Sequence, residues 1–138
     1  MARSSKGQVG IEYGAVLVLF LFILIPFLYI GITEIEISGQ VSQARVAVDS
    51  IADSADRVYA QGPGASTTVE IYLPVSVNYA SLNGREVNLN LLLPTGGTTD
   101  VYAISKGTLS GSVPTLPGRH VLVVSMNSDG KVYIKEAS

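Results

Sequence analysis

The sequence predicts an α+β protein, in which one long N-terminal helix packs on a small β-rich head. Residues 13–33 form a stretch of 21 positions without a charge, and residues 37–58 repeat apolar side chains at spacings of three and four. Beyond residue 62 the pattern changes to short alternating stretches separated by glycine, proline and asparagine. We therefore expect residues 8–61 to form the helix and residues 62–138 a small antiparallel β-sheet or sandwich.

The first half of the predicted helix has the length and composition of a membrane span. As a helix, residues 13–33 would extend about 31 Å at ~1.5 Å per residue, which matches the ~30 Å hydrocarbon core of a bilayer. A secretory leader would have a shorter apolar region of ~7–15 residues, followed by a small-residue cleavage site. Because Arg3 and Lys6 precede the span while Glu34 and Glu36 follow it, we expect a cytoplasmic N-terminus and an exported remainder.

Pro26 lies inside this span, where it has no N–H to donate to the carbonyl of Phe22. Neighbouring chains often satisfy such a freed carbonyl in membrane helices. We interpret Pro26 as a flex point, used when the helix leaves lipid and joins a bundle. A kink that is merely tolerated is the alternative.

The second half of the helix is polar except for one apolar stripe, which is one face of a continuous α-helix. We expect this stripe to pack against the head, because a core as small as that of the head is marginal alone. Gly62-Pro63-Gly64 then ends the helix. The stripe residues that we expect to contact the head are Val41, Ala44, Val48, Ile51, Ala55 and Val58.

The remainder of the chain predicts five or six short strands. Asn83-Gly84 is the strongest hairpin signal, and residues 127–130 predict a turn between the last two strands. The expected strands are Thr67–Leu73, Val75–Tyr79, Glu86–Leu93, Asp100–Ser105, His120–Met126 and Lys131–Lys135.

The composition argues against several classes of function. With no cysteine and one histidine, the chain cannot build a transition-metal site from thiolates or a histidine cluster, and no spacing supports a serine-histidine-aspartate triad. The formal net charge of −2 and the lack of a basic patch argue against nucleic acid. We expect no enzyme and no cofactor. We also expect the tyrosines beyond the span to be core and rim residues rather than an adhesive surface; they are Tyr59, Tyr72, Tyr79, Tyr102 and Tyr133.

The N-terminal residues carry a family resemblance. Gly7 directly before Gln8, with Glu12 as the fifth residue after that bond and a long apolar helix beyond it, resembles the precursor of an archaeal type IV pilin with a class III signal peptide. The resemblance covers roughly residues 3–32. It implies that a membrane-embedded prepilin peptidase cuts after Gly7, removes the leader 1–7 and leaves Gln8 as the new N-terminus. Family members often carry serine at the third position after the cut, where this chain has Gly10.

The resemblance implies a structural subunit of an extracellular adhesion pilus, a homopolymer assembled through the N-terminal helices. The implied partners are other copies of the chain, the prepilin peptidase and the assembly machinery, with the precursor held in the cytoplasmic membrane. A freed Gln8 α-amino group, with an ordinary pKa of about 7.7–8.0, would supply a cation for Glu12 and so assist subunit assembly. A minor pilin-like component, a singly anchored cell-envelope binding module and an archaeal flagellar filament subunit remain as alternatives.

Overall fold

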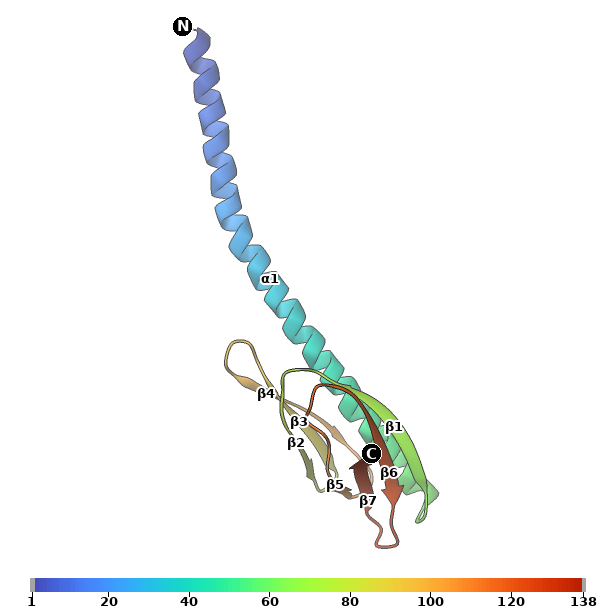
Figure 1. The fold of residues 1–138 in the computed structure, drawn as a ribbon. Coiled ribbons are helices and arrows are strands. Elements are labelled where there is room, and N and C mark those ends of the chain that lie inside the picture. Colours follow the sequence, from blue (N-terminus) through green and yellow to red (C-terminus); the bar gives the residue numbers. More distant parts are fainter. Residues whose placement is uncertain (1, 138) are drawn as a thin grey trace. The chain divides into compact units, whose positions relative to one another are not determined.

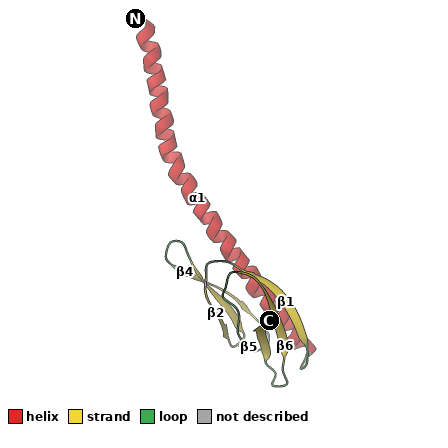
Figure 2. Ribbon diagram, in the orientation of Figure 1, coloured by secondary structure: helices red, strands yellow, loops and turns green. Residues whose placement is uncertain are grey.

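The computed structural model describes the backbone of residues 2–137 and the side chains of residues 9–32 and 37–137. In this part of the chain one helix, α1 (Ala2–Gln61), precedes seven strands (Figures 1 and 2). The predicted α+β class is therefore confirmed. The strands are β1 (Ser66–Leu73), β2 (Val77–Asn83), β3 (Glu86–Leu92), β4 (Thr98–Ile104), β5 (Leu109–Gly111), β6 (Gly118–Met126) and β7 (Val132–Glu136).

The chain divides into two units, Met1–Glu36 and Ile37–Ser138, and α1 contributes residues to both. We call residues 9–32 of the first unit the apolar segment and the second unit the head. Within the described residues, one helix is long and apolar enough to cross a membrane, with a mean hydropathy of 2.9 in its most apolar window. This agrees with the predicted long apolar helix at the N-terminus. Pro26 does not end α1, since the helix continues to Gln61.

The strands of the head form two sheets. The first has the order β1-β6-β7-β5 and the second has the order β2-β3-β4. All neighbouring strands run antiparallel except β5 and β7, which are parallel. The sheets meet where the amide of Leu109, at the start of β5, donates to the carbonyl of Gly84 in the β2–β3 turn at 2.7 Å.

Three hairpins organise these sheets, and one of them joins β3 and β4 through residues 93–97. Asn83 pairs with Glu86, so Gly84 and Arg85 form a two-residue loop between β2 and β3. Gly84 has φ +61°, and a glycine with positive φ at the first loop position suits the right-handed twist of a hairpin. The predicted hairpin is present, although Asn83 is the last residue of β2 rather than a loop residue. The third hairpin joins β6 and β7 through residues 127–131.

The core of the head combines the helix stripe with both sheets. Ala44, Val48, Ile51, Ala55 and Val58 have no exposed surface, and Val41 is partly buried against them. Ala47 of the helix is also buried in this core, and the other core residues come from all strands except β2, which contributes partly buried side chains. The helical part of the head and its two sheets therefore share one hydrophobic core. The strand residues of that core are Ile71, Leu73, Val87, Leu89, Leu91, Val101, Leu109, Leu122, Val124, Met126, Val132 and Ile134.

The structure corrects three expectations about the head. The second strand begins at Val77 and ends at Asn83, because Pro74 and the turn after it displace its start from Val75. The sheets are not purely antiparallel, because the three-residue strand β5 pairs in parallel with β7. The five tyrosines are not core residues. Four of them are exposed by 43% to 54%, and Tyr133 is half-buried.

Candidate functional site

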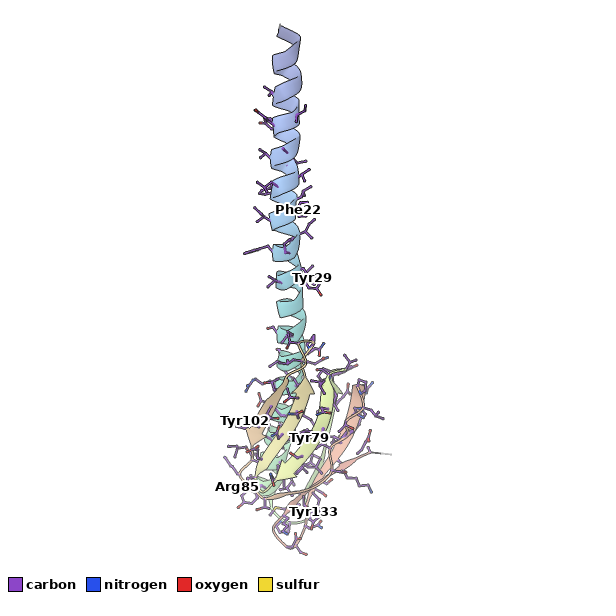
Figure 3. The ribbon with its side chains drawn as sticks, turned by 90° about the vertical axis from the view of Figure 1, so that its left-hand side faces the viewer. Phe22, Tyr29, Tyr79, Arg85, Tyr102 and Tyr133 are labelled. Atoms are coloured by element: carbon purple, nitrogen blue, oxygen red, sulfur yellow. The ribbon has the colours of Figure 1, made fainter. Side chains whose placement is uncertain are left out.

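The apolar segment presents a continuous apolar surface. All eighteen of its large apolar side chains are exposed, from 37% at Leu24 to 77% at Tyr13 and Phe27. Figure 3 shows Phe22 and Tyr29 on this segment. Among the described residues this is the helix whose length and apolar composition would allow it to cross a membrane.

Glu12 is the one charged residue of the apolar segment. It lies beside a shallow groove that is also lined by Val9, Tyr13 and Val16. Within the described residues, its carboxylate has no hydrogen-bond or ion-pair partner. At the predicted cut between Gly7 and Gln8 the structure describes the backbone but no side chain, so the predicted contact between Gln8 and Glu12 stays a prediction.

Asp56 links the helix to the connection between β4 and β5 by hydrogen bonds that the sequence did not predict, and we call this contact the Asp56 anchor. Asp56 Oδ1 accepts hydrogen bonds from the Ser105 hydroxyl at 2.9 Å and from the Lys106 amide at 2.7 Å. The Ser105 hydroxyl oxygen in turn accepts from the Gly107 amide at 3.3 Å. The helical periodicity placed Asp56 among polar positions, and its partners lie about fifty positions further along the chain. No short-range sequence signal identifies this contact.

The three-stranded sheet has one face in the core and one face open. Val87, Leu89 and Leu91 of the central strand β3 point into the core, so their alternate neighbours lie on the opposite side. We call that side the outer face, and Figure 3 looks onto it. By the strand register, its residues are Tyr79, Ser81 and Asn83 of β2, Glu86, Asn88, Asn90 and Leu92 of β3, and Thr98, Asp100, Tyr102 and Ile104 of β4.

A row of polar side chains crosses the outer face. Asn78 Nδ2 donates to Asn90 Oδ1 at 3.1 Å, and Asn90 Nδ2 donates to Asp100 Oδ1 at 2.7 Å. Asn90 is 5% exposed, whereas Asn78 and Asp100 are open to solvent. Asn78 can reach this row because the β2–β3 register shifts between Val77 and Tyr79. The sequence alone did not predict this row, since it depends on the bulge.

His120 connects the end of β7 to the segment between β5 and β6. Its Nδ1 lies 2.6 Å from Glu136 Oε1, and its Nε2 lies 2.7 Å from the Leu116 carbonyl oxygen. Both partners are acceptors, so the protonated imidazolium satisfies both contacts by donating twice. The hydrogen bond to the Glu136 carboxylate raises the pKa of His120 above 6.5, although desolvation opposes this shift. The geometry indicates a structural link between two parts of the head.

Comparison with known proteins gives no assignment: no family model, no curated protein and no solved structure matches the chain. Among the described residues, no group of three or more histidine or acidic side chains is placed to hold a metal ion. The features available for a functional argument are therefore the apolar segment with Glu12 and the surfaces of the head.

Proposed function

We propose that this chain is the structural subunit of an extracellular filament, an archaeal type IV adhesion pilus, built when the helices of many copies pack after removal of the leader 1–7. The observation that carries the proposal is the exposure of the whole apolar segment in a helix that continues into a head with its own core. The resemblance of residues 3–32 to pilin precursors supports the same function.

The energetics require an apolar environment for this segment. Fully burying one large apolar side chain contributes roughly 1.5–3 kcal/mol, so burying the eighteen exposed ones contributes on the order of tens of kcal/mol. Lipid supplies this burial for the precursor. Other copies of the same helix would supply it once the subunit leaves the membrane, which gives a reason for the chain to assemble rather than stay in water.

Glu12 makes assembly depend on processing. A carboxylate in an apolar bundle is unfavourable without a cation or hydrogen-bond partner. Cleavage after Gly7 would create an α-amino group on Gln8, which lies about 6 Å from Glu12 along the axis of a regular helix. The amine of the same or of a neighbouring copy would then pair with Glu12 and set the axial stagger between subunits.

Charge removal at Glu12 tests this assignment. The variant Glu12→Gln keeps the size and helix propensity of the side chain, so membrane insertion and leader cleavage are expected to stay normal. We expect few or no filaments on cells that express it, counted by negative-stain electron microscopy. Asp53→Asn is the matched control, because it removes one exposed carboxylate from the same helix within the head.

Three results would oppose the proposal. Wild-type numbers of filaments with Glu12→Gln would remove the role of the carboxylate in assembly. A chain that retains its leader and stays a membrane monomer would instead support the singly anchored binding module. Filaments that contain the chain in trace amounts would support a minor pilin-like component.

A further inference from the structure

The outer face combines two exposed tyrosines with a polar centre. Tyr79 is 49% exposed and Tyr102 is 54% exposed. Tyr79 pairs with Asn90 and Tyr102 pairs with Asn88, so the two tyrosines lie two strands and two residues apart. With strands ~4.8 Å apart and ~3.4 Å per residue, their backbone positions are separated by about 12 Å. A short oligosaccharide can bridge this span.

The polar groups between the tyrosines are already held in place. The hydrogen bonds through the buried Asn90 fix Asn78 on one side and Asp100 on the other, while both of these side chains remain open to solvent. Because these side chains are already ordered, binding a ligand to them costs less side-chain entropy than binding it to mobile side chains would. Asn88, which lies two residues before Asn90 on β3, has a buried Oδ1 atom with no hydrogen-bond partner in the described part of the chain. Such an unsatisfied buried acceptor is uncommon in a native protein.

The charge of this face limits the class of ligand. Strands β2, β3 and β4 contain no lysine or arginine, and their charged residues are Glu86 and Asp100. The exposed Arg85 lies in the β2–β3 turn, at one end of the face and away from its centre at Asn88 and Asn90. Phosphates, nucleic acids and acidic polysaccharides require cationic partners, so such an acidic face disfavours them. A neutral ligand rich in hydroxyl groups faces no such penalty.

The distribution of polarity argues against a protein partner. Protein interfaces place apolar residues at the centre and polar residues at the rim. Here Asn88 and Asn90 occupy the middle of the central strand β3. The exposed apolar side chains lie at the two ends of the face: Leu92 at one end, paired with Thr98, and Ile104 at the other, paired with Glu86. The arrangement is the reverse of a protein interface.

We propose that the outer face binds a neutral oligosaccharide. The C–H groups on the faces of two sugar rings pack on the rings of Tyr79 and Tyr102, whose π-faces carry partial negative charge. Asp100 accepts hydrogen bonds from sugar hydroxyls, and Asn78 exchanges hydrogen bonds with them. This site belongs to the head alone, so it stands whether the chain forms a filament or remains singly anchored.

The test uses the full-length chain in zwitterionic detergent, because a maltoside detergent would itself present sugar. Isothermal titration calorimetry measures binding of cellohexaose, chitohexaose and mannohexaose, with a polygalacturonate hexamer as the anionic probe. We expect at least one neutral probe to bind. The double variant Tyr79→Ala and Tyr102→Ala is expected to lower its affinity about tenfold or more. Tyr72→Ala is the matched control, because this tyrosine is 53% exposed on β1, outside the outer face, and we expect less than about a twofold change.

Any one of three results would overturn the proposal. The neutral probes could all fail to bind at millimolar concentration, the anionic probe could bind more tightly than they do, or the double variant could keep the wild-type affinity. A double variant that alters self-association in ultracentrifugation while sugar binding is unchanged would make the face a contact between copies instead.

Saturation-transfer NMR on the wild-type chain gives a test without variants. Irradiated tyrosine ring protons must transfer magnetisation to sugar-ring C–H protons, and absence of that transfer would contradict the stacking geometry.

Discussion

Shortening Ile51 to alanine is expected to unfold the head at a much lower temperature. Ile51 has no exposed surface and lies in the core that the helix shares with both sheets. The change removes three buried carbons at ~0.8 kcal/mol each, which gives about 2.4 kcal/mol of transfer free energy. A residual cavity adds roughly 1.5 kcal/mol more, so we expect the free energy of unfolding to fall by about 4 kcal/mol. For a domain near 100 residues, each kcal/mol corresponds to about 4–8 °C in Tm, so the expected shift is roughly 15–30 °C.

The assay is thermal unfolding of the full-length chain in detergent, followed by near-UV circular dichroism. Five of the seven tyrosines lie in the head, so this signal reports mainly on the packing of the head rather than on the helicity of the apolar segment. Val46→Ala is the matched control, because Val46 lies on the same helix and is 63% exposed. We expect it to change stability by less than about 0.5 kcal/mol. Equal shifts for the two variants, or a shift below about 5 °C for Ile51→Ala, would refute a core shared by helix and sheets.

Three further changes probe individual contacts in the head. Asp56→Ala leaves the buried Ser105 hydroxyl without its acceptor, so chemical denaturation should show that the free energy of unfolding falls by about 2–3 kcal/mol. Asp56→Asn keeps an oxygen acceptor and should lower the free energy of unfolding by less. The raised pKa of His120 means that its contact with Glu136 stabilises the fold fully below pH 6.5 and that this contribution is lost as pH rises through the higher folded-state pKa. The stability difference between wild type and His120→Gln should therefore shrink over that pH range, and a constant difference would contradict the contact. Gly111→Ala should lower stability by more than about 1 kcal/mol in the same denaturation assay, because Gly111 has φ +106° and a Cβ there would collide with a backbone carbonyl of β7. Unchanged stability would contradict the close pairing of β5 with β7.

Local patterns were sufficient to predict much of the fold. The spacing of Ala44, Val48, Ile51, Ala55 and Val58 identified the buried helix face, because helical periodicity depends on neighbouring residues alone. Most strands were predicted to within about two residues, since alternation and turn residues mark them locally. The long apolar helix followed from length and composition, which are also local properties.

Features that depend on distant residues were not predicted. Strand β5 has three residues and no alternating pattern, and it becomes a strand by pairing with β7 more than twenty positions later. The Asp56 anchor and the Asn78–Asn90–Asp100 row both join separate elements, and the row also needs the irregular register of β2. Exposure of Tyr79 and Tyr102 follows from which face of the sheet the helix covers. The hydrophobicity of a tyrosine does not by itself predict whether its side chain lies on the covered or on the open face of a sheet.

Intact-mass spectrometry of filaments sheared from the cell surface tests the proposed assembly most directly. We expect the main protein to have the mass of residues 8–138, with Gln8 as its first residue, because removal of the leader creates the cation that Glu12 needs in an apolar bundle. A main species with the mass of the full chain 1–138, or sheared filaments that lack this chain, would contradict assembly through a processed helix.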